Sequence, residues 1–224
     1  MLKRIFFDFG GCLDAPGIHT RTLFWDAFLA EGLVNEEART EFQEAYTLAD
    51  RRMMSTGEAA KLELVPFNQH NASLIAEKIG LSKEASYRAG DRVTELMSGY
   101  LNESREVLEQ FERYELSVIS NFTGNLELIM KEFGLRDFFG SVTESYYAGF
   151  SKPDLRIFQA ALAKHLDHPS ECLYVGDNPV NDIAPARQLG MKTALIHPAG
   201  KRRECGANFY VEDLRSLAAE IQSR

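Results

Sequence analysis

Short hydrophobic runs, each followed by a polar loop, occur at the start of the chain and throughout its second half. Continuous apolar runs of roughly four to eight residues are typical of strands that are buried on both faces of a parallel sheet. We therefore predict strands at residues 2–8, 116–119, 141–144, 173–175, 192–196 and 208–211.

Between the first two runs, residues 18–100 have hydrophobic positions at helical spacing and no convincing strand. One set lies within residues 42–53 and another within 89–100, with members three or four residues apart. Pro66 and the cluster at 55–57 interrupt the pattern. This segment is predicted to be a small helical bundle inserted after the first strand.

From residue 104 onwards, predicted helices separate the strands. They lie near residues 126–133, 154–165 and 214–221, and Asn181 is expected to cap a further helix that ends at Gly190. Strands that alternate with helices favour an α/β fold with a doubly wound, mostly parallel sheet over an all-helical protein.

The pattern also predicts the domain organisation. Residues 1–16 and 101–224 are expected to form the α/β core, and residues 17–100 a helical cap domain. A chain of 224 residues is long enough for one well-buried core with a small accessory domain.

Composition and charge exclude several classes of partner. A net charge of −8 disfavours non-specific nucleic-acid binding, which requires a basic surface. No apolar stretch is long enough for a signal peptide or a membrane span, so we expect no membrane partner. Cys12, Cys172 and Cys205 lack the spacing of a disulfide or zinc framework. These features predict a cytoplasmic protein, and its oligomeric state stays open.

Polar residues that could carry chemistry follow the predicted strands. Because the carboxyl ends of parallel strands share one edge of a sheet, these residues should meet in one crevice. The residues are Asp8, Ser120, Asn121, Lys152, Asp177 and Asp182.

Each residue type has a part to play in phosphoryl transfer. Asp8 could act as a nucleophile. Asp177 could bring a second carboxylate to Mg²⁺, which commonly binds one or two carboxylates together with substrate phosphate. Ser120 and nearby backbone amides could hold a phosphate, and Lys152 could neutralise its charge.

Four segments, in order, resemble the motifs of the haloacid dehalogenase (HAD) superfamily. The first is Asp8–Leu13, with the sequence Asp-Phe-Gly-Gly-Cys-Leu, and the second is Val118–Asn121. Gly149–Asp154 is similar to the third motif, and Val175–Asp182 looks like the fourth. Each motif alone is weak, but together they extend over nearly the whole chain.

This resemblance implies a Rossmann-like HAD core and a magnesium-dependent phosphatase of a small phosphorylated metabolite, such as a sugar phosphate. Asp8 would form an aspartyl-phosphate, and Ser120 and Lys152 would complete the catalytic set. The resemblance further implies magnesium ligands at Asp8, the Gly10 carbonyl, Asp177 and Asp182, and phosphate contacts at Gly11, Ser120, Asn121 and Lys152.

Gly10 departs from the family pattern, because most phosphatases of this superfamily carry a second aspartate there as general acid and base. Such help is typically worth ~10²–10⁴-fold in rate. Four alternatives stay open: a phosphatase for substrates with good leaving groups; a phosphatase in which a cap residue, a water or the substrate itself serves as the acid; a metal-independent 2-haloacid dehalogenase; and a weakly active or non-catalytic phosphate-binding relative. The Gly-Asp pair at 176–177 favours the metal-dependent phosphatase.

Overall fold

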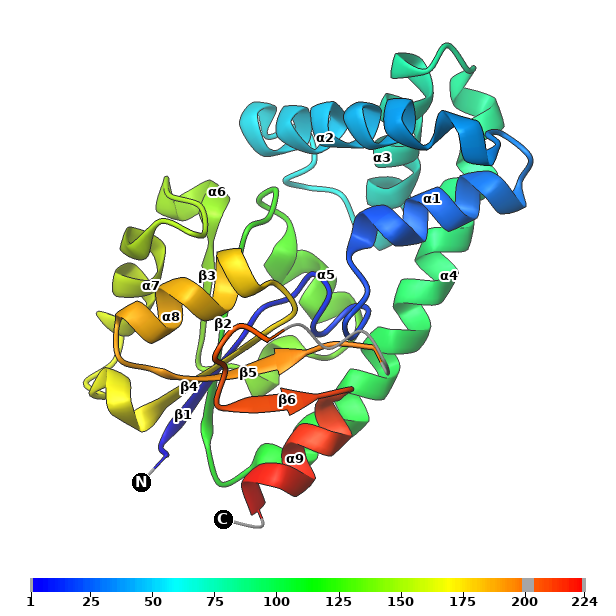
Figure 1. The fold of residues 1–224 in the computed structure, drawn as a ribbon. Helices are drawn as coiled ribbons and strands as arrows, with labels where there is room; N and C mark the ends of the chain where they lie inside the picture. Colours follow the sequence, from blue (N-terminus) through cyan, green and yellow to red (C-terminus); the bar gives the residue numbers. More distant parts are fainter. Residues whose placement is uncertain (1, 199–203, 223–224) are drawn as a thin grey trace.

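The computed structural model describes residues 2–198 and 204–222 and contains one six-stranded sheet (Figure 1). All neighbouring strands are parallel, in the order β3-β2-β1-β4-β5-β6. The strands are β1 (Arg4–Phe7), β2 (Glu115–Ser120), β3 (Ser141–Glu144), β4 (Cys172–Gly176), β5 (Lys192–Ile196) and β6 (Phe209–Val211). The predicted α/β class with a parallel sheet is confirmed.

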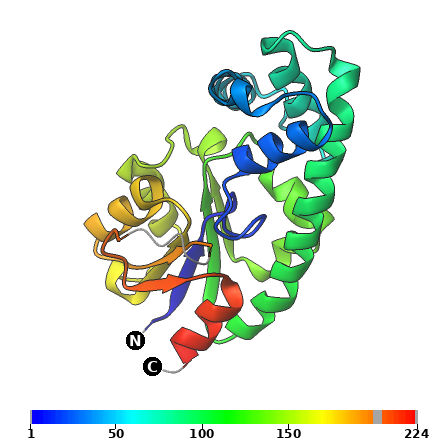
Figure 2. The ribbon, with the colours of Figure 1, turned by 45° about the vertical axis from the view of Figure 1, so that its right-hand side comes forward.

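Helices cover both faces of the sheet and form a separate group beyond one of its edges (Figures 1 and 2). The helices are α1 (Thr20–Ala30), α2 (Arg39–Thr56), α3 (Leu64–Lys78), α4 (Lys83–Leu108), α5 (Leu126–Glu132), α6 (Ser145–Ala148), α7 (Leu155–Leu162), α8 (Ala184–Gln188) and α9 (Leu214–Gln222). We call α1–α4 and their connections, residues 20–108, the helical segment.

β1 is buried along its whole length, as its apolar sequence predicts. Successive side chains of a strand point to opposite faces, so Ile5 and Phe7 enter one hydrophobic core and Phe6 enters another. Phe6 shares its core with Phe158 of α7 and Tyr174 of β4. The strand therefore lies in the middle of the molecule, and the residue that follows it is held by packing on both sides.

The helices of the helical segment have the local signals that start and stop helices. Ser82 caps α4 by accepting a hydrogen bond from the Ala85 N–H, and α2 ends at Gly57 with a left-handed φ of 70°. α4 packs on α1 and α3, and it continues beside the sheet to α9. Glu106 of α4 forms an ion pair with Arg215 of α9. No strand occurs among the described residues 18–100, as predicted.

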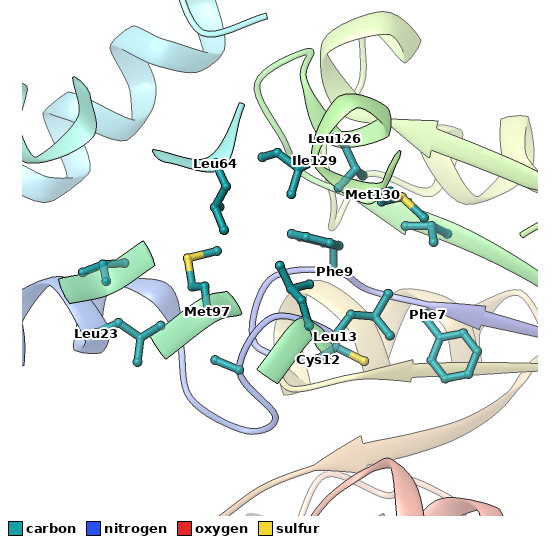
Figure 3. Packing of buried hydrophobic residues seen from close by; sticks show 14 of the residues in the cluster. Phe7, Phe9, Cys12, Leu13, Leu23, Leu64, Met97, Leu126, Ile129 and Met130 are labelled. Carbon is teal, nitrogen blue, oxygen red and sulfur yellow. The ribbon is translucent and has the colours of Figure 1, made fainter. Parts of the chain in front are cut away.

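The loop after β1 is fixed between the sheet side and the helical segment by apolar side chains (Figure 3). Phe9 and Leu13 lie between Met97 of α4 on one side and Leu126 and Ile129 of α5 on the other. Ser104 of α4 also donates a hydrogen bond of 2.7 Å to the Leu13 carbonyl. The backbone that carries the first motif is consequently held rigidly by hydrophobic contacts.

One predicted helix start was wrong. Asn181 does not cap the helix after β4, because Asn178 accepts hydrogen bonds from the Val180 and Asn181 amides. A π-helical turn, Pro179–Ile183, follows that cap, and α8 begins only at Ala184. The observed cap at Asn178 therefore lies three residues before the predicted cap at Asn181, with the π-helical turn between the cap and α8.

The division into a core and a cap domain stays a prediction, and residues 1, 199–203 and 223–224 of the predicted core lie outside the described residues. None of the helices within residues 2–198 and 204–222 combines the length and the hydrophobicity that a transmembrane span requires. The cytoplasmic location also stays a prediction from the sequence.

Candidate active site

Three adjacent strands bring the predicted residues to one edge of the sheet. β1 lies between β2 and β4. Phe7, the last residue of β1, pairs with Val118 of β2 and Val175 of β4, so the three strands end within two residues of one another. Asp8, Ser120 and Asp177 consequently line a common cavity of about 200 Å³, together with Lys152 and Asp182. The cavity lies between this edge and the helical segment.

Asp8 is buried, and both of its carboxylate oxygens have partners. Its Oδ1 accepts hydrogen bonds from the Phe9 N–H at 2.7 Å and the Ser120 hydroxyl at 2.8 Å. Its Oδ2 lies 2.8 Å from the Lys152 ammonium. These three donors come from the β1 loop, the end of β2 and the loop before α7, so the carboxylate is fixed in one orientation.

Lys152 is buried in the wall of the cavity and is surrounded by acceptors. Its ammonium lies 2.7 Å from Asp182 Oδ1 and 3.0 Å from the Tyr174 hydroxyl, in addition to its contact with Asp8. Burial alone would lower the pKa of Lys152, but the carboxylates of Asp182 and Asp8 outweigh burial and raise it. The lysine is therefore charged at every physiological pH.

Asn121 and Gly11 were both predicted to contact phosphate. The side-chain amide of Asn121 and the backbone N–H of Gly11 already have hydrogen-bond partners within the protein. The Asn121 side chain binds the main chain of Lys152, accepting from its N–H at 2.7 Å and donating to its carbonyl at 3.0 Å. The Gly11 N–H donates to Asp14 Oδ1 at 2.6 Å. Their predicted phosphate contacts stay predictions, while the observed role of Asn121 is to position Lys152.

Three carboxylates converge beside this lysine. Ligand atoms of Asp8, Asp177 and Asp182 all lie within 4.8 Å of one another. Burial, followed by the charges of Asp182 and Asp8, raises the pKa of Asp177 to about 8. One ammonium does not balance three carboxylates, so this cluster favours either a proton on Asp177 or a divalent cation.

The donor set fits Mg²⁺, which prefers oxygen ligands. Asp8 and Asp177 offer carboxylate oxygens, and no described residue donates a hydrogen bond to the Gly10 carbonyl. Both oxygens of Asp182 are engaged, one with Lys152 and the other with the Asn178 N–H at 3.0 Å. Asp182 therefore also positions Lys152, and its predicted role as a magnesium ligand, like that of Asp8 and Asp177, stays a prediction.

The two glycines of the first motif differ in what they tolerate. A Cβ at Gly11 would lie 2.5 Å from Asp177 Oδ2, and Gly11 has a φ of +72°, so no side chain fits there. A Cβ at Gly10 would meet nothing closer than the Thr20 hydroxyl oxygen at 3.8 Å, and φ at Gly10 is not in the left-handed region. A Cβ therefore fits at position 10 and does not fit at position 11.

Asp14 lines the cavity and was not among the predicted site residues. It is 1% exposed, and its Oδ2 has no hydrogen-bond partner among the described residues. Burial raises the pKa of Asp14 to about 7. An acidic residue directly after the apolar pair Cys12-Leu13 was the signal that could have identified it.

The helical segment contributes the other wall of the cavity, and sequence patterns did not identify its lining. Residues 46, 50 and 54 are four apart and share one face of α2. The lining residues from this segment and its neighbouring loops are His19, Thr20, Tyr46, Asp50, Met54, Phe67, Asn71, Met97, Phe122 and Thr123.

Comparisons with known proteins agree with this geometry. The family model of the haloacid dehalogenase-like hydrolases matches residues 2–190. Haloacid dehalogenase-like hydrolase domain-containing protein 3 of Xenopus laevis is 41% identical over 83 residues, which are 37% of this chain and 34% of that protein. The ribulose-1,5-bisphosphate 5-phosphatase of Halopiger xanaduensis is 31% identical over 111 residues, 46% of each chain. The chain thus spans between a third and a half of the length of these curated relatives.

Solved structures share the fold over the whole chain. The HAD-hydrolase YfnB from Bacillus subtilis, bound to magnesium, has a TM-score of 0.61 at 16% identity and covers 98% of both chains. A 2-haloacid dehalogenase from Pseudomonas syringae has a TM-score of 0.57 at 22% identity and covers 100% of this chain and 99% of its own. At these identities the likeness concerns the fold alone.

Proposed function

This chain belongs to the haloacid dehalogenase-like hydrolase family, and from that premise we propose that it is a magnesium-dependent phosphatase of a small phosphorylated metabolite. The reaction passes through an aspartyl-phosphate on Asp8, and the helical segment acts as the cap over the substrate. The proposal rests on one observation: the buried Asp8 carboxylate, fixed by three donors, lies beside two further carboxylates that only one ammonium balances.

The residues of this chain divide the chemistry between them. In the first step a carboxylate oxygen of Asp8 forms a bond to phosphorus as the bond to the leaving oxygen breaks. Ser120 and Lys152 then orient the phosphate oxygens and neutralise their charge, which is most of what phosphoryl transfer requires. In the second step water attacks phosphorus, and the Asp8 carboxylate leaves with its original atoms.

The proposed active site also includes a magnesium ion. Asp8, Asp177 and the Gly10 carbonyl would hold Mg²⁺, which when bound would neutralise the carboxylates and the substrate phosphate. Asp182 keeps Lys152 in place, because one of its oxygens is 2.7 Å from the ammonium and the other accepts from the Asn178 amide.

Gly10 limits the substrates of the proposed enzyme. It supplies no side-chain acid for the leaving oxygen, a form of help worth ~10²–10⁴-fold in rate. We therefore propose that the best substrates have leaving groups that need little protonation, such as acyl, anomeric or aryl phosphates, or have a hydroxyl of their own that supplies the proton.

A metal-independent 2-haloacid dehalogenase is the second candidate, because a departing halide needs no proton and Gly10 offers none. Asp177 argues against it. It adds a third carboxylate within 4.8 Å of Asp8 and Asp182, a set that suits a cation, and a metal-independent dehalogenase has no use for one.

Hydrolysis of p-nitrophenyl phosphate, measured with and without Mg²⁺, tests the proposal. We expect activity that requires Mg²⁺, is removed by EDTA and is abolished by Asp8→Asn. Asp26→Asn is the matched control, because Asp26 is exposed on α1 and does not line the cavity. Activity that survives EDTA contradicts the metal assignment. Chloride release from 2-chloropropionate without metal supports the dehalogenase, and phosphate binding without turnover of any phosphate ester indicates a non-catalytic relative.

A further inference from the structure

We propose that the cap side of the cavity selects a small, hydroxylated organic group without negative charge, so that the substrate carries one phosphate and neither a second phosphate nor a carboxylate. This inference rests on the proposed function, since it takes the strand-end residues as the place of the reacting phosphate. It assigns specificity to Asp50 and Asn71, which no motif identifies.

The charges around the cavity are the first argument. Among the described residues that line it, Lys152 is the only lysine or arginine, and Asp8 and Asp182 already hold its ammonium. The acidic lining residues are Asp8, Asp14, Asp50, Asp177 and Asp182. A phosphate at the strand ends would have Lys152 and a cation to neutralise it. For an anion at the opposite end of the substrate, the described lining offers only His19, and burial lowers the pKa of that imidazole and so favours its neutral form.

Asp50 makes the far end of the cavity repel anions. It lies on α2, one turn after Tyr46 and one turn before Met54, with all three on the face that lines the cavity. It is half-buried and has no hydrogen bond or ion pair with any described residue. Burial raises the pKa of Asp50, and the charge of the adjacent Arg51 opposes that rise. A carboxylate of this kind accepts hydrogen bonds from hydroxyl or ammonium groups and repels phosphates and carboxylates.

Asn71 provides a second hydrogen-bonding group on the same side. It is 3% exposed on α3, and its Oδ1 has no hydrogen-bond partner among the described residues. Buried polar atoms are nearly always satisfied in folded proteins, so an unsatisfied one that lines a cavity points to a partner on the ligand. An amide can both donate and accept, which suits a hydroxyl group.

Apolar side chains form another part of the lining and limit the size of the ligand. Phe67 and Phe122 stack at a ring-centroid distance of 5.5 Å, and Met54 and Met97 complete this surface. An apolar surface opposite hydrogen-bonding groups fits the C–H face and the hydroxyls of a sugar or polyol. At about 200 Å³ the cavity is below the ~300–1,000 Å³ of common ligand sites.

This specificity differs from the reaction named for one relative. The Halopiger xanaduensis relative is a ribulose-1,5-bisphosphate 5-phosphatase, and a bisphosphate needs cationic partners at both ends. The cavity described here has such a partner at the strand ends only.

Paired substrates that differ in one anionic group test the inference. The values of kcat/KM with Mg²⁺ are compared for sorbitol 6-phosphate against 6-phosphogluconate, and for glycerol 3-phosphate against 3-phosphoglycerate. In each pair, we expect kcat/KM to be at least about tenfold higher for the substrate without the additional anionic group. This is the order expected from one partly screened charge a few ångströms away. Asp50→Asn should reduce that preference by about tenfold, mainly through KM of the more anionic partner, while Asp26→Asn leaves it unchanged.

Asn71 has a separate readout. Asn71→Ala should lower kcat/KM for ribose 5-phosphate by about tenfold and leave p-nitrophenyl phosphate, which has no hydroxyl, within about twofold. Equal loss for both substrates means that the residue only supports the fold, and overturns its assignment.

Binding to the Asp8→Asn protein separates this inference from the proposed function. Calorimetry with ribose 5-phosphate and ribose 1,5-bisphosphate reports selectivity even if the wild type turns over nothing. Tighter binding of the monophosphate supports the inference. The inference is overturned if the bisphosphate binds equally well or more tightly, if the preference is unchanged in Asp50→Asn, or if neither compound binds. If the wild type does not turn over p-nitrophenyl phosphate, only the proposed phosphatase activity is refuted.

Discussion

Gly10→Asp tests directly whether the missing acid limits the reaction. A Cβ at position 10 has ordinary contacts, with the Thr20 hydroxyl oxygen 3.8 Å away as its nearest neighbour, and the backbone there suits an L-residue. The new carboxyl would extend from the same loop as Asp8 into the cavity. We expect the folded protein to accommodate it without rearrangement.

The expected gain follows from general acid catalysis. A positioned acid contributes ~10²–10⁴-fold, equivalent to about 3–5 kcal/mol of transition-state stabilisation. A carboxylate added about 5 Å from Asp8 or Asp177 also costs about 3 kcal/mol per neighbour at an effective dielectric constant of about 20. Mg²⁺ offsets that repulsion, so the comparison belongs at saturating Mg²⁺, where we expect a net gain near the lower limit, about 10²-fold.

The assay compares leaving groups. Turnover of glycerol 3-phosphate, whose alkoxide needs a proton, should rise by about 10²-fold, and turnover of 2,4-dinitrophenyl phosphate, whose leaving group needs none, should stay within about threefold. Gly10→Ala has the same Cβ without the acid and should leave both rates unchanged. A fall in both rates for Gly10→Asp, with Gly10→Ala active and equally stable to urea, would refute the reasoning and show that the site is built around glycine.

Three further predictions concern the buried charges. Lys152→Met leaves Asp8 and Asp182 without their cation and should lower the free energy of unfolding by about 3–5 kcal/mol, measured by urea denaturation at pH 7; a smaller loss at pH 5, where the carboxylates can protonate, is the accompanying check. Because burial raises the pKa of Asp177 to about 8, Mg²⁺ must displace a proton, and its calorimetric Kd should weaken by about tenfold per pH unit from pH 8 to pH 6; a pH-independent Kd contradicts this. Burial raises the pKa of Asp14 to about 7, so the native state retains a proton that the unfolded chain has lost, and stability falls as pH rises from about 4 to about 7. Asp14→Asn should make that fall shallower, by up to about 4 kcal/mol, and an unchanged pH profile of the melting temperature rejects the assignment.

The sheet and its strand-end residues could be predicted from the sequence because both follow from local patterns. Short, continuous apolar runs that alternate with helices are typical of strands in the middle of a parallel sheet, and the first polar residue after such a strand lies at the carboxyl edge. Asp8, Ser120 and Asp177 are such residues, and they line one cavity.

The lining from the helical segment could not be predicted in the same way. Helical periodicity shows which face is buried, but it does not distinguish a side chain that packs in a core from one that lines a cavity. Phe42 of α2 packs in the core, whereas Tyr46, in the same buried stripe one turn later, also lines the cavity. The orientation of α2 and α3 over the sheet edge decides the difference, and that orientation depends on contacts between residues distant in sequence. The predicted cap at Asn181 was wrong for a similar reason, because a π-helical turn after the observed cap at Asn178 changes the helical spacing.

The hydrogen bonds of Lys152 have a consequence for the order of events at the site. An ammonium has three protons, and Asp8, Asp182 and the Tyr174 hydroxyl accept one each. An incoming phosphate can therefore gain a hydrogen bond from Lys152 only by exchange, and Asp8, the acceptor nearest the reacting phosphate, is the partner to be displaced. In the proposed reaction, Lys152 therefore covers Asp8 Oδ2 before the substrate binds, and the arrival of the phosphate would expose that oxygen.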